Sequence, residues 1–432
     1  MTSLAIRLRG PLDADRLADA FTEVVARHEA LRTTFDDGVQ IVHPPHEVAF
    51  TDNRPFDLRR GPLIRPRLER VADDEHVLAL EIHHIVTDGW SNGVILDEVM
   101  ALYRGETLDR PTIQYADFAA WQRNRDLDGQ LAYWTQTLAE LPAADLPTDR
   151  PRPAVRTTTG AVHEAVVPQR IATRLREISR RHETTLFTTL NAACNILLSR
   201  WTGQRDVTVG TVTNGRDRAE LDRVVGFFVN TLVLRSTVAG TFDDYLDTVR
   251  GNVQEAFKHQ DVPFERVVDA VQPQRDPSRT PLFQVMVVLQ NAPQAAPRLP
   301  GIEVEDVELP LTTANFDVTI EFQEQGGDLL VAVTYNADLF EADTIARLTE
   351  HLGILLDGIA AEPSAKIAEL PLLTADELQK LAAWNNSTVA TKPCTLAELV
   401  EEQAARTPKA TAVMGTETLT YAELNARANA LA

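Results

Sequence analysis

The stretch "EIHHIVTDGWSNG", residues 81–93, places two adjacent histidines a few residues ahead of an Asp-Gly pair. An imidazole can take up or release a proton near neutral pH, and a nearby carboxylate can orient it or brace the turn. Successive side chains of a strand point to opposite faces. On a strand over "HVLALEIHHIV", His84 therefore ends an apolar row and is expected to point into the protein, whereas His83 shares its face with Glu81. The apolar row consists of Leu78, Leu80 and Ile82.

The segment after the histidines could support chemistry on a polar substrate. Gly89 has no β-carbon, so a ligand can approach its backbone closely, and backbone N–H groups at a helix start can stabilise a developing oxyanion. Ser91 is the predicted N-cap of the next helix. These residues alone leave two interpretations of His84 open, an acid/base or hydrogen-bonding group and an ordinary core histidine beside a turn. A metal site is disfavoured, because adjacent strand histidines diverge and no further ligand recurs at metal spacing.

The elements that must position this stretch alternate between strand and helix. Apolar periodicity predicts the order β, α, β, α up to the helix after Ser91, and the same kind of pattern resumes later in the chain. The predicted elements are strands at 3–10 and 76–86 and a helix within 11–35, then helices at 170–183 and 186–201 and strands at 206–213 and 227–235. The fold class is therefore α/β (α+β), with a main body of two lobes.

Composition excludes several classes of protein. With 432 residues, 44% of them hydrophobic and 24% charged, the chain fits a globular protein of about three folding units. A formal charge of -21 repels phosphate backbones and disfavours nucleic acid as a partner. Cys194 and Cys394 are the only cysteines, so neither a disulfide framework nor a cysteine metal cluster is expected. The cysteine content instead fits a protein of the reducing cytosol. Neither a signal peptide nor an apolar run of about 18 residues is found, so nothing in the sequence indicates a membrane location.

Breaks in periodicity suggest where the domains divide. A Pro- and Arg-rich segment, residues 146–162, is predicted to link an N-terminal lobe, 1–145, to a C-terminal lobe, 163–373. Residues 374–394 form a second predicted linker, and 395–432 the truncated start of another domain. Three capping-box patterns begin at Thr374, Thr395 and Thr420. Because the sequence stops inside a predicted helix, we expect it to be part of a longer protein.

"HHIVTDGWS" resembles the His-His-x-x-x-Asp-Gly signature of the condensation domains of nonribosomal peptide synthetases. Five further stretches resemble the other core motifs of that family, in the family's order. They are "RHEALRTTF" (27–35), "YADFAAW" (115–121), "VGFFVNTLVLR" (225–235), "HQDVPFE" (259–265) and "RDPSRTPLFQVMVVLQN" (275–291). The family's first motif is missing at the start of the chain. Residues 395–432 resemble the opening of an adenylation domain, with "LTYAEL" (419–424) at its first core motif.

The resemblance implies two chloramphenicol-acetyltransferase-like lobes arranged in a V, with a tunnel between them. Donor and acceptor carrier proteins would insert phosphopantetheine arms from opposite ends. The acceptor amine would attack the donor thioester and form an amide, with no metal and no directly bound cofactor. His84 would take a proton from the amine or orient it, and Gly89 would belong to the catalytic set.

The resemblance also assigns supporting roles near the catalytic histidine. Asp88 is the expected structural aspartate, paired with an arginine. Strand alternation suggests Arg235 as that arginine, because it shares a face with apolar residues and would need a counter-ion. His83 is expected to hold the turn. Possible tunnel residues are Trp90, Ser91 and Asn291.

The subtype and the alternatives also depend on the resemblance. The motifs look most like condensation domains whose donor ends in an L-amino acid. One alternative is an epimerisation domain of the same fold, which the adenylation-like segment downstream argues against. Another is a non-catalytic platform that docks carriers or tailoring enzymes, which the intact His84, Asp88 and Gly89 argue against. The expected location is the bacterial cytosol.

Overall fold

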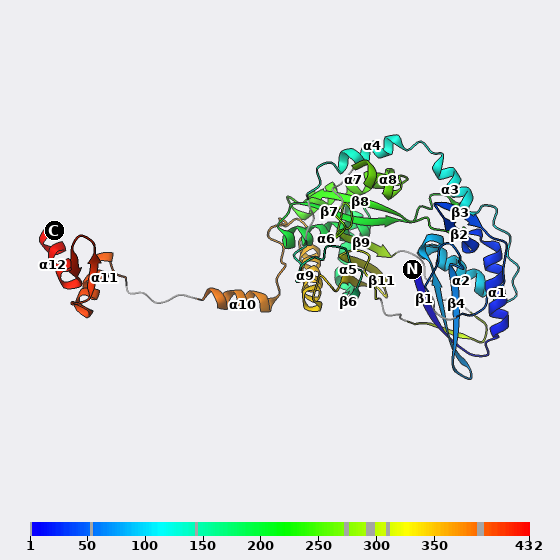
Figure 1. The fold of residues 1–432 in the computed structure, drawn as a ribbon, viewed down its shortest axis with the longest axis horizontal. Coiled ribbons are helices and arrows are strands. Elements are labelled where there is room, and N and C mark those ends of the chain that lie inside the picture. The colour runs from blue at the N-terminus through cyan, green and yellow to red at the C-terminus, as the bar shows by residue number, and fades with distance from the viewer. Residues whose placement is uncertain are drawn as a thin grey trace. The chain divides into compact units, whose positions relative to one another are not determined.

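The computed structural model describes residues 2–51, 55–142, 146–271, 276–290, 299–307, 312–386 and 393–432. The chain divides into two compact units, Met1–Leu373 and Thr374–Ala432. Figure 1 shows both units as ribbons. The candidate site lies in the first unit.

The first unit begins with a four-stranded antiparallel sheet in the order β10-β1-β5-β4. Its strands are β1 (Thr2–Arg9), β4 (Ile64–Ala72), β5 (Glu75–Ile82) and β10 (Glu303–Asp306). Helices α1 (Ala14–Arg27) and α2 (Gly89–Tyr103) share one apolar cluster with it, which we call the first core. The predicted row of Leu78, Leu80 and Ile82 is confirmed, since each is at most 1% exposed. A short turn, η1 (Glu29–Arg32), and a hairpin of β2 (Thr33–Asp36) and β3 (Val39–Val42) follow α1.

A six-stranded mixed sheet, in the order β6-β12-β11-β9-β7-β8, carries the larger second core. Its strands are β6 (Gly160–Val167), β7 (Asp206–Thr213), β8 (Asn230–Thr237), β9 (Val285–Gln290), β11 (Val318–Gln325) and β12 (Asp328–Asn336). Strand β9 pairs in parallel with both of its neighbours, and the other pairs are antiparallel. The associated helices are α5 (Gln169–Arg181), α6 (Leu186–Thr202), α7 (Phe242–Lys258), α8 (Phe264–Val271) and α9 (Ala342–Ala361). Figure 1 shows the two sheets side by side within the first unit.

Two segments cross between the cores, so the predicted boundary at residue 145 does not separate them. Helix α4 (Asp128–Thr137), preceded by α3 (Tyr115–Arg123), contributes to the second core although it precedes that boundary. Its Trp134 is 2% exposed, and the indole N–H donates to the carbonyl of His259 over 2.8 Å. In the other direction, β10 follows β9 in sequence but pairs with β1 of the first sheet.

The second unit consists of α10 (Ala375–Asn385), α11 (Leu396–Arg406), β13 (Thr411–Met414), β14 (Thr418–Thr420) and α12 (Tyr421–Leu431). The three predicted capping boxes are confirmed. In each, a threonine side chain accepts from the backbone N–H three residues later, and the glutamate there accepts from the N–H of the threonine.

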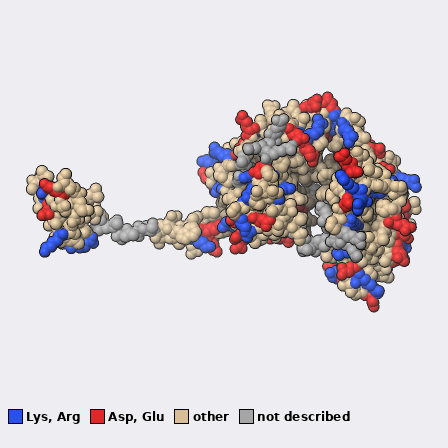
Figure 2. Space-filling model, in the orientation of Figure 1, with Lys and Arg blue, Asp and Glu red and all other residues tan. Residues whose placement is uncertain are grey.

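The surface carries both signs of charge. In Figure 2, acidic and basic side chains are interspersed over the visible face of the first unit. Among the described helices, none combines the length and apolar character needed to cross a membrane.

Candidate functional site

The two histidines lie in a turn and not in a strand. β5 ends at Ile82, and residues His84–Val86 form a single 3-10 turn, η2, capped by His83. The prediction that strand alternation separates the histidines is therefore wrong at these two positions. At the start of this turn the His83 side chain accepts a hydrogen bond from the Ile85 N–H, a local contact that competes with strand pairing.

Hydrogen bonds, and not strand faces, distinguish the two imidazoles. His84 Nδ1 lies 2.7 Å from the carbonyl oxygen of Thr87. A carbonyl can only accept, so Nδ1 carries the proton and Nε2 of the neutral ring has a lone pair. His83 is the reverse: its Nδ1 accepts from the Ile85 N–H over 3.2 Å, which places its proton on Nε2. His84 is thus the histidine that presents a basic nitrogen.

The surroundings of His83 favour its neutral form. Burial lowers the pKa of His83 below its usual 6.5, and the neighbouring His84 adds to the effect. The ring also packs edge-on against Phe56, with ring centroids 5.8 Å apart. These contacts join the His83 ring to the backbone of the turn and to Phe56.

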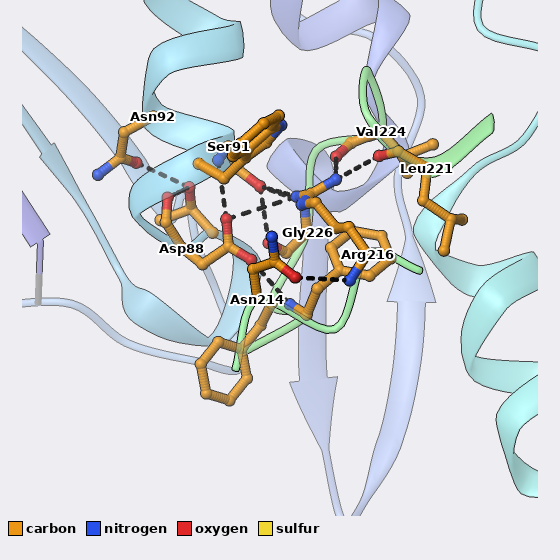
Figure 3. Close-up of polar contacts among 12 residues, drawn as sticks. Asp88, Ser91, Asn92, Asn214, Arg216, Leu221, Val224 and Gly226 are labelled. Carbon is orange, nitrogen blue, oxygen red and sulfur yellow. Dashed lines mark hydrogen bonds and ion pairs between the residues drawn. The ribbon is translucent and has the colours of Figure 1, made fainter. Parts of the chain in front are cut away.

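Asp88 is fully buried and acts as the N-cap of α2, in place of the predicted Ser91. Its Oδ1 accepts from the Ser91 N–H over 2.7 Å, and its Oδ2 accepts from the Phe228 N–H over 3.0 Å. The guanidinium of Arg216 completes the arrangement, with Nη2 at 3.4 Å from Oδ1. Figure 3 shows Asp88 and Arg216 facing each other, with Ser91 and Gly226 beside them.

The arginine that pairs with Asp88 is Arg216, so the prediction of Arg235 is wrong. Arg235 forms an ion pair with Asp206 on the adjacent strand β7, at 2.7 Å, and also donates to the carbonyls of Thr137 and Ala139. It lies five residues into β8 from Asn230, roughly 17 Å along the strand. That strand position carries Arg235 away from Asp88.

Arg216 belongs to the loop between β7 and β8, residues 214–229, which we call the bridging loop. The Arg216 side chain is 1% exposed. It donates to the carbonyls of Leu221 and Val224 and to the hydroxyl of Ser91. Burial lowers the pKa of this guanidinium, and the charge of Asp88 opposes that effect. The bridging loop also inserts Val225, 1% exposed, into the first core.

Two of the three predicted tunnel residues bind the bridging loop. The Trp90 indole N–H donates to the Asp222 carbonyl over 2.8 Å. The hydroxyl of Ser91 donates to the Gly226 carbonyl over 2.9 Å and accepts from the Gly226 N–H over 3.1 Å. The third, Asn291, lies outside the described residues.

Open space lies next to Gly89, the first residue of α2. The residue is exposed, and a β-carbon built on it would meet no atom within 4 Å. The glycine is therefore not required by packing within the described protein. The space leaves its backbone open to approach by another molecule.

Phe227 and Tyr115 were missed as site residues. The Phe227 ring packs edge-on against the His84 ring, with centroids 5.0 Å apart and planes at 70°. The Tyr115 hydroxyl donates to the Phe227 carbonyl over 2.7 Å. The predicted strand over 227–235 concealed this contact, because β8 begins only at Asn230 and Phe227 lies in the bridging loop.

The histidine of the motif "RHEALRTTF" has a structural role. Glu98 on α2 binds both Arg27, at 3.0 Å, and His28, at 2.9 Å, and all three side chains are at most 5% exposed. Burial alone would raise the pKa of Glu98, but hydrogen bonds and charges from His28 and Arg27 hold it below its usual 4.5. This cluster fixes α1 against α2 and so supports the helix that starts at Gly89.

A cavity of about 260 Å³ lies between α3 and the end of α7. Arg216 and Phe228 line it, whereas His84 and Gly89 do not. The cavity is thus separate from the catalytic candidates. Among the described residues, no group of three or more His, Cys, Asp or Glu side chains could hold a metal ion.

Comparisons with known proteins agree on one family. The family model for the condensation domain matches residues 46–382. Chondramide synthase cmdD of Chondromyces crocatus is 40% identical over an alignment covering 98% of this chain. Tyrocidine synthase 3 of Brevibacillus parabrevis is 39% identical, with 98% of this chain covered. The chain spans only 12% and 7% of the lengths of these two relatives.

Solved structures show the same fold. The X-domain from teicoplanin biosynthesis superposes with a TM-score of 0.81 at 28% identity, covering 86% of this chain and 93% of that one. The four-domain nonribosomal peptide synthetase holo-AB3403, bound to AMP and glycine, gives a TM-score of 0.78 at 23% identity. That match covers 98% of this chain and 36% of the synthetase, and it concerns the fold alone.

Proposed function

Because the chain belongs to the condensation-domain family, we propose that it forms an amide bond in nonribosomal peptide biosynthesis. The donor is a peptidyl or aminoacyl thioester and the acceptor an aminoacyl thioester, each on the phosphopantetheine arm of a carrier protein. The observation that carries the proposal is the 2.7 Å contact between His84 Nδ1 and the Thr87 carbonyl oxygen, from which the Nδ1–H tautomer follows. This arrangement leaves Nε2 able to accept a proton or a hydrogen bond.

Amide formation from a thioester requires a group that can orient the amine and accept its proton. The acceptor amine attacks the donor carbonyl, so a C–N bond forms and the C–S bond breaks. The proton lost by the amine leaves with the departing thiolate as a thiol. His84 Nε2 orients the amine and is placed to carry that proton. Since a thioester is already activated, holding the two arms end to end supplies much of the acceleration, several kcal/mol by the effective-molarity argument.

Gly89 and Asp88 have different roles in this scheme. The open space at Gly89 lets the reacting thioester approach the start of α2, where backbone N–H groups favour developing negative charge. Asp88 does not reach the substrate, because its oxygens are bound by Ser91, Phe228 and Arg216. It acts as a brace that joins α2 to the bridging loop.

Finer features of the family are part of the same proposal. The two lobes would form a V with a tunnel that admits the donor arm from one end and the acceptor arm from the other. The motifs favour a donor that ends in an L-amino acid. The second unit would be the start of an adenylation domain, supported by its "LTYAEL" stretch and by relatives whose alignments cover 98% of this chain.

A docking platform is the second candidate function. One observation favours it: the teicoplanin X-domain, a close structural match, has been solved in a complex with OxyB. A platform needs no basic nitrogen beside open backbone, so the His84 and Gly89 arrangement argues for catalysis.

A single-turnover assay tests the proposal against both alternatives. The chain is mixed with a donor carrier and an acceptor carrier, each bearing one of a panel of L-aminoacyl phosphopantetheine thioesters, and the acceptor is analysed by mass spectrometry and chiral chromatography. We expect a dipeptidyl acceptor with both stereocentres retained. Inverted donor with no new amide would indicate an epimerisation domain, and carrier binding without any product would indicate a platform.

A further inference from the structure

We propose that Phe227 is a positioning residue for His84 and that Tyr115 holds it in place from α3. The inference deepens the proposed amide-forming function and rests on it. Phe227 comes from the second lobe's bridging loop, whereas His84 and Tyr115 come from the first lobe's turn and helix. The orientation of the catalytic imidazole would then depend on how the two lobes are fastened together.

The Phe227 ring is available for this role because it is not used in a core. It is 38% exposed, unlike its neighbours Val225 and Phe228, which are 1% and 4% exposed. Its ring meets the His84 ring edge-on at 5.0 Å, a geometry that aromatic pairs favour. Among the described residues, hydrogen bonds reach the His84 ring only at Nδ1. One bond at one corner leaves the ring free to rock, and a second contact from Phe227 limits that motion.

The backbone of the bridging loop is fastened at three consecutive residues. Each fastening joins the loop to a side chain of the first lobe close to the His84 turn. The pairs are Gly226 with the Ser91 hydroxyl, the Phe227 carbonyl with the Tyr115 hydroxyl, and the Phe228 N–H with the Asp88 carboxylate. Because Phe227 is the middle residue, its position is fixed from both sides and at its own carbonyl.

Tyr115 contacts the bridging loop through both its hydroxyl and its ring. Burial, together with the nearby Asp88 charge, raises the pKa of Tyr115 to about 12, so its hydroxyl stays protonated and can donate. A β-carbon on Gly226 would lie 2.1 Å from the Tyr115 ring, so only glycine lets the loop pass. The Tyr115 ring limits where the backbone can pass at Gly226, and the Tyr115 hydroxyl holds the Phe227 carbonyl by a hydrogen bond.

The test compares Tyr115→Phe, Phe227→Ala and Phe227→Leu with the wild-type chain. Tyr133→Phe on α4 is the matched control, since it removes a hydroxyl from a tyrosine that packs against the second core. The first readout is independent of catalysis: two-bond proton–nitrogen correlation spectra of protein labelled with ¹⁵N-histidine report which ring nitrogen of His84 is protonated. The second is kcat and KM for dipeptide formation with aminoacyl-loaded carriers.

In the wild type and in Tyr133→Phe, we expect His84 to show a protonated Nδ1 and an unprotonated Nε2. In Tyr115→Phe and Phe227→Ala, the two nitrogen shifts should move toward each other, and kcat should fall roughly 3- to 10-fold with KM for the carriers unchanged. Phe227→Leu keeps apolar bulk without a ring edge, so its nitrogen shifts and its kcat should lie between those of the wild type and those of Phe227→Ala.

Unchanged His84 nitrogen shifts in Phe227→Ala would overturn the inference, whatever happens to the rate. A rise in KM with constant kcat would also contradict it, because that result indicates carrier binding and not positioning. If the wild type forms no amide, the proposed function fails, and the nitrogen shifts still decide whether Phe227 positions the ring.

Discussion

The Asp88 carboxylate and the Arg216 guanidinium lie 3.4 Å apart, and neither side chain is more than 1% exposed. The pair joins the first turn of α2, which packs on the four-stranded sheet, to the bridging loop, which connects β7 and β8 of the six-stranded sheet. Removing one member of a buried pair leaves an uncompensated charge, which costs far more than the pair itself contributes. We therefore expect the pair to support the fold near His84 through contacts within the protein.

Asp88→Ala should destabilise the protein strongly. The loss of the charge partner costs about 3–5 kcal/mol, and the loss of the N-cap adds about 1 kcal/mol. Urea unfolding followed by tryptophan fluorescence measures the free energy of unfolding. An unchanged midpoint would exclude the bracing role. Asp88→Asn should be milder, because the amide oxygen can still cap α2.

Arg216→Met and Arg235→Met form a matched pair of variants. Arg216→Met leaves Asp88 buried and unpaired, so we expect a loss of about 3–5 kcal/mol in the free energy of unfolding, together with loss of activity. Arg235 and Asp206 are 25% and 30% exposed, so Arg235→Met should cost no more than about 1 kcal/mol. If the two substitutions lowered the free energy of unfolding equally, Arg216 would not be the ion-pair partner that stabilises Asp88.

Gly89→Ala should separate stability from activity. Since a β-carbon there meets nothing within 4 Å, the free energy of unfolding should stay within about 1 kcal/mol of the wild type, on the stabilising side. The added methyl group occupies the space proposed for the thioester, so the single-turnover rate should fall at least about tenfold. A variant as fast as the wild type would show that substrate does not use this space.

His83 should make the protein less stable as the pH falls. Its pKa is lowered from 6.5 in the folded state, so the unfolded chain binds the proton more tightly. The stabilising contribution is complete above the unfolded pKa of 6.5 and is lost as the pH falls through the folded value. Urea unfolding at pH 7.5, 6.5 and 5.5 measures it. Glu98 does not interfere, because its pKa lies below 4.5.

His83→Asn is the control for that pH dependence. The asparagine oxygen can accept from the Ile85 N–H in place of Nδ1, but the side chain does not titrate. The part of the pH slope due to His83 should then disappear while stability at pH 7.5 is largely kept. A slope identical to that of the wild type would assign the effect to another group.

The sequence predicted those parts of the fold in which the chain has one apolar face. The body of strand β5, the helix α1 and the three capping boxes follow from local periodicity and local hydrogen bonding, whereas the end of β5 at Ile82 does not, because the periodic pattern continues to residue 86. The order of the first sheet does not, because β10 is four residues long and reaches β1 through a pairing distant in sequence. Short segments with no periodic pattern carry little information about their partner.

The same limit explains which site residues were found. The motif of residues 81–93 singles out His84, Asp88 and Gly89 as candidates, because their spacing is itself the signal. Arg216 lies in a loop without periodicity and among other arginines, and only the folded loop shows which of them turns inward. The apolar strand neighbours of Arg235 predict a side chain that needs a buried counter-ion, but Asp206 on the adjacent strand pairs with it at a partly exposed position.

We propose that His84 Nε2 acts on the attacking amine. The most direct measurement is the single-turnover rate of dipeptide formation for the wild type and His84→Ala, with equal melting temperatures as the condition for comparison. The predicted result is a rate reduced at least about tenfold in His84→Ala, and by up to roughly 10⁴-fold where proton transfer limits the step. Equal rates for two equally folded proteins would contradict the claim.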